Sequence, residues 1–402
     1  MKFAAKHPWT ILAAGAAVQI LTGIPAAWGV FQQPVMEEYG MSEQGTEYAF
    51  ALLIAAFGVG CVLGGFLQDR RGPRCAGLWG TALLCGGLCT AAMLPEGGTG
   101  FYLGFSIPAG LGTAFLYPSI QSCAQKWYAG RKGLATGVIG GAVGLSGAFL
   151  TFFVRTAVRG IGFLQGIRGA LLGLGAVSLP VCLAGSLLLQ DPPEPRQKNT
   201  GGVDLSPWQM LGTRQYWLCA GAVCFSTPAV LLFSPVILKL GVERGLDEKA
   251  ALWSVVLGSV GSAAGRLLMP LLSDRVGRRA ADGLLFAGSL GLSVGFAFAR
   301  GWMVVAVYGG LTFCYSGLAA VLPALSTDLF GLPHAGVNYG FLALGQSVGS
   351  LAFPFAANFF GLEVGRHWMA VAAAGAGFAC IRALRPVEPS AGRGQRGMDR
   401  TC

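Results

Sequence analysis

The sequence predicts an all-α membrane protein with twelve transmembrane helices in two six-helix bundles. Hydrophobic residues make up 53% of the 402 residues and charged residues only 11%, whereas a soluble domain carries about 25% charged residues. The apolar residues form continuous runs instead of alternating with polar ones, which argues against a transmembrane β-barrel. Because one helix with its loop takes roughly 33 residues, the length accommodates about twelve spans.

One polar stretch divides the apolar runs into two sets of six. Residues 191–199 contain three prolines and four charged residues, so they cannot cross a membrane. We therefore expect an N-terminal bundle at 1–190, a cytoplasmic linker at 191–214, a C-terminal bundle at 215–386 and a cytoplasmic tail at 387–402. The predicted spans are 9–31, 49–68, 75–94, 101–124, 133–154, 167–190, 215–238, 250–272, 282–300, 302–325, 337–360 and 364–384.

The distribution of basic residues predicts the orientation. Most of the 28 lysines and arginines fall in the loops that lie on the same side as both termini. By the positive-inside rule, both termini are then cytoplasmic and the protein is a multi-pass protein of the plasma membrane. The loop between the fifth and sixth spans is an exception, since Arg155, Arg159 and Arg168 surround it. The loops are too short for a nucleic-acid surface, so the net charge of +10 does not indicate one.

An internal repeat supports two similar halves. Residues 69–74 and 274–279 both follow the pattern D-R-x-G-x-R, and about half the chain length separates them. A repeat at this spacing indicates two bundles in the same orientation. Transporters of this build hold their substrate between the halves, near the middle of the membrane.

These two loops resemble the cytoplasmic signature of the major facilitator superfamily. Residues 126–137, 327–331 and 338–341 are also similar to segments of the oxalate/formate antiporter family, whose cousins are the monocarboxylate transporters. The resemblance extends from the first span to the last. It implies a secondary transporter that moves small organic anions by alternating access. It implies no enzyme activity and no cofactor, and we expect a monomer in the lipid bilayer.

Arg266 is the most informative single residue. It lies in an apolar run, eight residues before Asp274, and a rise of about 1.5 Å per residue puts it about 12 Å into the bilayer. A cation at that depth costs at least about 2.5–3.5 kcal/mol. All 18 acidic residues are expected in loops or at span ends, so an anionic substrate could supply the missing negative charge. The alternative is that Arg266 reaches the interface or bonds backbone carbonyls. The resemblance implies that this position binds substrate.

Four further residues are candidates for the substrate cavity. Tyr117 and Tyr315 lie inside apolar runs in equivalent spans of the two halves, where a buried hydroxyl needs a partner. The resemblance implies that both are aromatic cavity residues, although packing or a bond between helices would also explain them. Trp28 is a similar candidate, with anchoring at the membrane interface as its alternative. Gln121 could bind substrate or a neighbouring helix.

Gln346 marks a departure from the related family. The oxalate carriers place a lysine at the position that matches Gln346, so their site has two positive charges. With one of the two cations missing, a single guanidinium balances a single carboxylate. We therefore expect a small monocarboxylate as substrate and poor binding of oxalate.

The signature loops predict a gate. Asp69, Arg70 and Arg74 lie in the first loop, and Asp274, Arg275 and Arg279 lie in the second. Such clusters can hold the two halves together on the cytoplasmic side and release them as the bundles rock. The alternative is that these basic residues only set the orientation.

Exchange of one anion for another, or uniport, is the expected mode of transport. No acidic residue within a predicted span offers a proton relay, although the acid itself could carry a proton in a symport. Two other classes remain open. An intramembrane protease would use Ser146 within a G-x-S-G pattern, together with His334 and Asn338, but no histidine falls inside a span. A sensor with a transporter fold would lack turnover. No group of residues has metal-ligand spacing.

Overall fold

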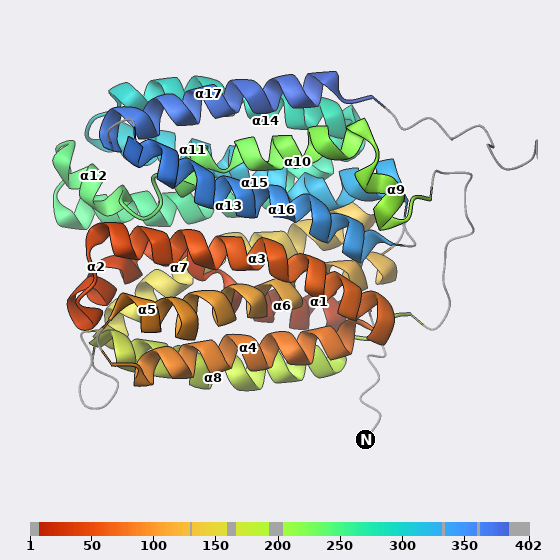
Figure 1. The fold of residues 1–402 in the computed structure, drawn as a ribbon, viewed down its shortest axis with the longest axis horizontal. Coiled ribbons are helices and arrows are strands. Elements are labelled where there is room, and N and C mark those ends of the chain that lie inside the picture. Colours follow the sequence, from red (N-terminus) through yellow and green to blue (C-terminus); the bar gives the residue numbers. More distant parts are fainter. Residues whose placement is uncertain are drawn as a thin grey trace, which may run out of the picture.

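The computed structural model describes residues 8–95, 97–128, 131–158, 166–192, 204–331, 334–359 and 362–385. These residues form helices and turns, with no strand among them. The long helices run between two ends of the molecule (Figure 1). The end that carries the turns at Gly72 and Gly277 is called the linker end here, and the opposite end is called the far end.

The helices follow the predicted spans in order. Those of the first half are α1 (Pro8–Thr22), η1 (Ile24–Ala27), α2 (Trp28–Tyr39), α3 (Glu43–Arg71), α4 (Pro73–Met93), α5 (Gly98–Phe101), the π-helical turn η2 (Tyr102–Ser106), α6 (Ile107–Trp127), α7 (Lys132–Val158) and α8 (Gly166–Leu188). Those of the second half are α9 (Pro207–Leu211), α10 (Arg214–Ser226), α11 (Pro228–Leu231), α12 (Ile237–Glu243), α13 (Glu248–Val276), α14 (Arg278–Phe298), α15 (Trp302–Phe330), α16 (Ala335–Phe359) and α17 (Leu362–Ala383).

Most of the long helices are apolar enough to cross a membrane by themselves. Within the described ranges, nine helices meet that description, and the bent pair formed by α1 with η1 and α2 makes a tenth. The other two predicted spans are α17, which carries Arg366 and His367 near its start, and the segment α10–α12, which is broken into short pieces. Large apolar side chains also face outward, and Leu63, Phe152 and Phe355 are 51%, 67% and 69% exposed. Such an apolar surface suits contact with lipid.

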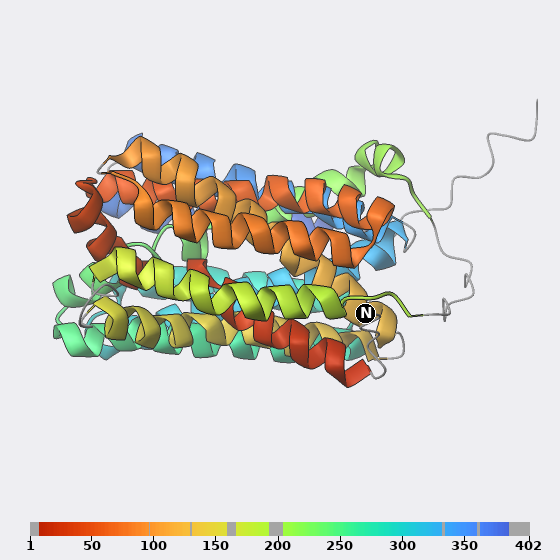
Figure 2. The ribbon, with the colours of Figure 1, turned by 90° about the horizontal axis from the view of Figure 1, so that it is seen from below.

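Two spans bend near the middle of the molecule. The axis of the first span turns by 43° between α1 and the segment that follows it, at Gly23 and Pro25 (Figure 2). The seventh span breaks where Pro228 follows Thr227. Proline removes a backbone hydrogen bond and therefore weakens a helix at its position. Both breaks bring backbone and short side chains to the space between the two halves.

The repeated D-R-x-G-x-R loops form two equivalent turns. Gly72 joins α3 to α4 with φ of 84°, and Gly277 joins α13 to α14 with φ of 90°. A residue with a side chain rarely adopts such a positive φ, so glycine is needed at both positions. In the first turn, Pro73 then starts α4, where its fixed φ suits the first position of a helix.

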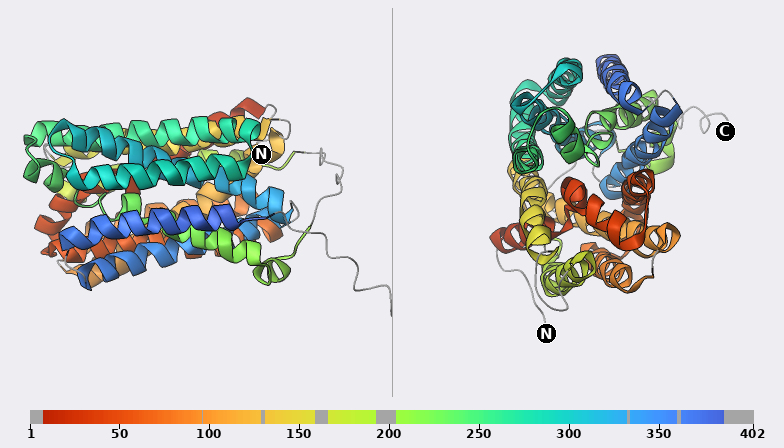
Figure 3. Two further views of the ribbon diagram at one scale, coloured as in Figure 1. Left: turned by 90° about the horizontal axis from the view of Figure 1, so that it is seen from above. Right: turned by 90° about the vertical axis from the view of Figure 1, so that its left-hand side faces the viewer.

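The helices form two groups, which are clearest in the end-on view of Figure 3. Helices α1–α8 pack on one another, as do helices α10–α17. Two helix pairs make the broadest contacts between the groups, α3 with α16 and α7 with α13. Close approach is possible because small residues face each other there. A Cβ added to Gly144 of α7 would lie 2.3 Å from the Ala263 Cα of α13. The predicted domain boundaries stay a prediction, because most of the linker lies outside the described residues.

Candidate functional site

A central cavity of about 130 Å³ lies between the two groups of helices. The first group contributes residues of α1, α3, α6 and α7, and the second contributes residues of α11, α13, α15 and α16. The lining is mainly apolar, with hydroxyl and amide groups at intervals. This composition suits a small ligand that has one polar group.

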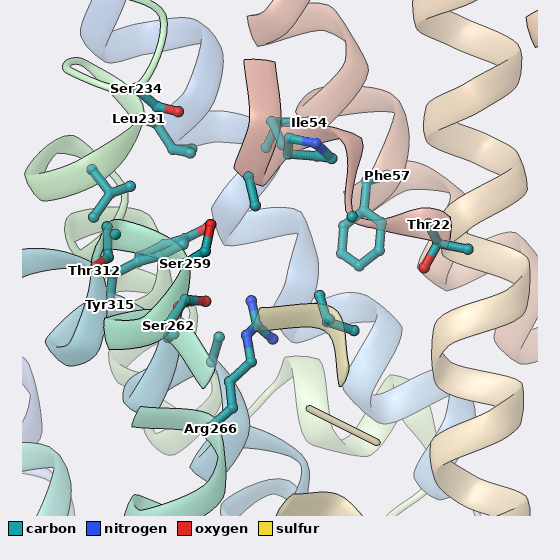
Figure 4. A pocket seen from close by; sticks show the side chains of 18 of the residues that line it. Thr22, Ile54, Phe57, Leu231, Ser234, Ser259, Ser262, Arg266, Thr312 and Tyr315 are labelled. Carbon is teal, nitrogen blue, oxygen red and sulfur yellow. Dashed lines mark hydrogen bonds between the residues drawn. The ribbon is translucent and has the colours of Figure 1, made fainter. Parts of the chain in front are cut away.

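Arg266 is the cationic residue of the cavity lining. It extends from α13 into the space between the groups, with Ser259 and Ser262 on the same helix beside it (Figure 4). Across from it, Gly140 of α7 has no side chain, and a Cβ there would lie 3.1 Å from the Arg266 Cβ. Arg266 Nε is buried without a hydrogen-bond partner. Among the described residues, no acidic side chain forms an ion pair with it.

Three other predicted residues line the same cavity. Tyr315 of α15 accepts a hydrogen bond from Nε2 of Gln346 of α16, at 2.8 Å. Tyr117 of α6 lies on the other side, and its ring centroid is 6.2 Å from that of Phe57. Arg266, Tyr315, Gln346 and Tyr117 thus surround one space from both halves, so the sequence-predicted candidates converge there. Their roles in binding stay predictions.

Two predicted residues lie apart from the cavity lining. Trp28 is fully buried in an aromatic cluster, with ring centroids 5.8 Å from Phe50 and 6.2 Å from Phe105. Gln121 is buried one turn from Tyr117 and donates a hydrogen bond to its hydroxyl, at 3.2 Å. The structure therefore places Trp28 in the core of the first half and Gln121 behind a cavity residue.

The cavity also contains polar residues that the sequence analysis did not single out. Ser262 and Ser316 share a hydrogen bond of 2.7 Å, and Thr312 donates to the Gly309 carbonyl at 2.8 Å. Thr22 and Gln19 of α1 face them from the first half, and Thr22 donates to Gln19 Oε1 at 2.7 Å. Serine and threonine are common in packed membrane helices, so their presence in the sequence carries no signal of a cavity.

At the linker end, the two signature aspartates each contact a helix of the other half. The backbone N–H of Val337, in the first turn of α16, donates a hydrogen bond to Asp69 of α3. A Cβ added to Gly133, in the first turn of α7, would lie 2.5 Å from Asp274 Oδ2. A carboxylate at a helix N-terminus is stabilised by the free N–H groups and the helix dipole. Each aspartate thus lies beside the first turn of a helix of the other half, Asp69 beside α16 and Asp274 beside α7.

The signature arginines do not share these contacts. Arg70 and Arg275 are exposed, and Arg74 is partly exposed. Arg279 donates to the carbonyls of Ile381 and Arg382, so it holds the end of α17 within its own half.

A neighbouring arginine outside the predicted gate pairs with the second signature aspartate. Arg278 lies 2.5 Å from Asp274 and 3.3 Å from Asp328. Arg278 fills a variable position of the D-R-x-G-x-R pattern, so the repeat gives no signal for its role.

At the far end, two ion pairs that were not predicted from the sequence join the halves. Glu43 of α3 lies 2.8 Å from Lys239 of α12, and Glu47 of α3 lies 2.5 Å from Arg366 of α17. The second pair is the more buried, with side chains 12% and 14% exposed, against 39% and 57% for the first. Both pairs border a space of about 320 Å³.

The acidic residues depart from the sequence expectation in one respect. Sequence alone places Asp282 at the end of a span. In the structure it lies one turn inside α14, is 3% exposed and has no hydrogen-bond partner for Oδ1. The arginine-rich loop between the fifth and sixth spans is partly explained, because Arg168 pairs with Glu38 at 2.6 Å. Arg159 lies outside the described residues.

The residues of the protease alternative are not brought together. Ser146 donates to the Val143 carbonyl, at 2.5 Å, while Asn338 donates to the Leu205 carbonyl, at 3.2 Å. His334 is exposed beside the start of α16, at the linker end. No catalytic arrangement forms among these described residues.

Comparison with known proteins decides the family. The family model for the Major Facilitator Superfamily matches residues 11–313 and 235–400. The chain belongs to the major facilitator superfamily. The all-helical structure fits this assignment: with 14% identity, its TM-score to a crystal structure of the Escherichia coli fucose:proton symporter is 0.67, covering 95% of this chain and all of that one.

Several curated transport proteins are similar over most of the chain. An uncharacterized MFS-type transporter of Escherichia coli, YhjX, is 24% identical over 354 residues, which are 85% of this chain and 86% of that protein. The oxalate:formate antiporter of Oxalobacter formigenes is 22% identical over 338 residues, 83% of this chain and 79% of that one. The human monocarboxylate transporter 11 is 26% identical over 273 residues, 66% of this chain and 56% of its own length. The chain is therefore a multi-pass membrane transporter and not an enzyme.

Proposed function

We propose that this superfamily member transports small organic anions, with monocarboxylates as the natural substrates, by alternating access and with anion exchange as its basic mode. The observation that carries the proposal is the guanidinium of Arg266, which enters the central cavity without an acidic partner among the described residues. A buried cation needs a counter-charge, and a substrate carboxylate can supply it through two parallel hydrogen bonds. The similarity to an oxalate:formate antiporter and to a monocarboxylate transporter supports the same class of substrate.

The other cavity residues have supporting roles in this proposal. Tyr315 and Tyr117 would orient the carboxylate beside Arg266, and the remaining apolar lining would accept the hydrocarbon part of the substrate. Gln346 adds no charge, so one cation meets one carboxylate. The contacts of Asp69 and Asp274 would form when the cavity is closed toward the linker end and break when it opens there. The pairs of Glu43 and Glu47 would do so at the far end.

The orientation is part of the proposal. The positive-inside distribution supports a cytoplasmic linker end, with both termini inside the cell and the far end outside. We place the protein in the plasma membrane as a monomer.

Counterflow in liposomes tests the function. Purified protein is reconstituted into liposomes that are preloaded with unlabelled formate, acetate, lactate or oxalate. Uptake of the same anion in labelled form is then followed at equal pH on both sides of the membrane. We expect internal monocarboxylate to stimulate uptake strongly and oxalate to do so poorly. A lack of stimulation by every anion of the panel would contradict the proposal.

The Arg266→Gln variant tests directly whether the charge of Arg266 binds the anion. A unit charge about 4 Å from a carboxylate contributes about 4 kcal/mol at an effective dielectric near 20, which corresponds to roughly three orders of magnitude in affinity. We expect the variant to insert and fold but to lose uptake. The matched control is Arg300→Gln, which removes an equal charge from an exposed loop position and should transport normally. Equal uptake by the two variants would show that Arg266 does not bind the anion.

Proton-coupled symport is the second candidate mode. Asp282 favours it, because this residue gives the second half a buried carboxyl group close to the cavity.

A further inference from the structure

A small side chamber opens the C-terminal bundle next to the central cavity. It has a volume of about 40 Å³ and shares Tyr315, Ala319, Tyr339 and Gln346 with the lining of the cavity. Its lining also includes Asp282 of α14. A volume above about 15 Å³ can hold a water molecule if polar partners surround it, and Asp282, Tyr315 and Gln346 provide such partners.

Asp282 is unusual among the acidic residues of the described chain. Its side chain is 3% exposed, Oδ1 has no hydrogen-bond partner, and none of the described ion pairs includes it. Burying an unpaired carboxylate costs far more than burying a neutral carboxylic acid. In this position, burial therefore favours the protonated form of Asp282 over the ionised form.

The charged and titratable groups around Asp282 do not satisfy it. On its own helix, Arg278 is engaged by Asp274 of α13 and Asp328 of α15, at 2.5 and 3.3 Å. Arg279 is engaged by backbone carbonyls of α17. Among the described residues, the titratable groups that line the side chamber with Asp282 are Cys219 on α10, Tyr315 on α15 and Tyr339 on α16. Cys380 and Arg382 on α17 flank Ile381, which also lines the chamber.

We propose that Asp282 is a proton-binding site whose occupancy controls the affinity of the central cavity for anions. The proposal rests on the proposed function and deepens it. With Asp282 protonated, the charge of Arg266 in the central cavity is uncompensated and attracts an anion. With Asp282 ionised, its negative charge offsets Arg266 through a medium of low polarity and the anion binds less well. By linkage, an anion that prefers the protonated form also raises the affinity for the proton. Proton and anion then bind together.

The magnitude is large enough to measure. At an effective dielectric near 20, a unit charge about 10 Å from a bound anion changes the affinity for that anion about ten-fold. We therefore expect monocarboxylate affinity to fall about ten-fold as pH rises through the titration of Asp282.

Binding to purified full-length protein tests the proposal. The probes are labelled formate, acetate and lactate, with binding measured between about pH 6 and about pH 8, where each probe is fully ionised. Wild type should lose affinity as pH rises. Asp282→Asn should bind with the affinity of the acidic form at every pH. The matched control is Asp328→Asn, which removes a carboxylate that is 56% exposed and pairs with Arg278. This variant should keep the wild-type pH dependence.

Calorimetry on the wild type gives a readout that does not depend on any variant folding. Titrations in buffers of different ionisation enthalpy report the protons taken up on binding, and we expect net uptake of a fraction of one proton. Binding without proton uptake, or an Asp282→Asn variant with the wild-type pH dependence, would overturn the proton site and leave the proposed function standing. No binding of any probe by wild type would overturn both.

Discussion

Removing one charge from the buried ion pair at the far end should open that end of the transporter. The perturbation is Glu47→Gln, which keeps the shape of the side chain and leaves Arg366 without its partner. The pair forms between α3 of the first half and α17 of the second, so it exists only while the far end is closed. Its loss therefore destabilises the closed state more than the open one.

Burial decides the size of the effect. Breaking a buried ion pair by removing one partner costs about 3–5 kcal/mol, and the Glu47 and Arg366 side chains are 12% and 14% exposed. A change of about 3 kcal/mol shifts an equilibrium by roughly two orders of magnitude. Glu43 and Lys239 form the matched comparison, because they join the same halves but are 39% and 57% exposed. An exposed pair contributes about 0–1 kcal/mol, so Glu43→Gln should shift the equilibrium less than about five-fold.

The assay measures access to the space beneath the pair. Val236 borders that space and is 5% exposed. A Val236→Cys substitution in a background without native cysteines reports opening through its rate of reaction with a membrane-impermeant thiol reagent. We expect a rate increase of about 100-fold for Glu47→Gln, and a return toward the starting rate when Glu47→Arg is combined with Arg366→Glu. Equal rates for the Glu43 and Glu47 variants would refute the reasoning, because burial would then not set the strength of the gate.

Three further outcomes are expected at the cavity and at a helix crossing. Arg266→Lys keeps the charge but loses the planar fork, so uptake in liposomes should fall at least about ten-fold; full uptake would mean that charge alone suffices. Gln346→Lys adds a cation beside Tyr315, and a unit charge about 5 Å away contributes on the order of 3 kcal/mol. Competition binding should therefore show preference moving from monocarboxylates toward oxalate, and an unchanged rank order would argue against a charge-setting role. Gly144→Ala puts a Cβ 2.3 Å from the backbone of Ala263 and should slow transport, whereas Gly86→Ala, with nothing within 4 Å, should not.

The parts of the fold that depend on local sequence could be predicted. A single arginine inside a long apolar run is visible without any structure, and Arg266 does lie in the central cavity. The D-R-x-G-x-R repeat likewise predicted two equivalent elements, and the structure shows why its glycine is required, since Gly72 and Gly277 both adopt positive φ. Tyr117 and Tyr315 could be placed because their spans occupy matching positions in the two halves, and Gln346 could be placed from the resemblance to the oxalate/formate antiporter family.

The parts that depend on packing between distant helices could not be predicted. Charges near span ends are ordinary, so nothing in the sequence shows that Glu47 meets Arg366 from the last helix. The same holds for Asp282, which lies only one turn inside its helix, and whose burial results from packing against α15 and α17. Trp28 is ambiguous for a related reason. Its position near the outer end of a span fits a cavity or an interface, and only the bend after α1 turns it into an aromatic core.

The far-end ion pairs also determine what an arriving ligand meets. All the acidic partners, Glu43 and Glu47, stand on the first half, and all the basic partners, Lys239 and Arg366, stand on the second. Once the halves part, the vestibule has one negative wall and one positive wall. An anion drifting in from solution is drawn along the positive wall, on the half that also carries Arg266, and the attraction weakens as salt screens it. When the far end is closed, the two oppositely charged walls are thus paired with each other. When it opens, the wall of the second half becomes a positive surface that leads to Arg266.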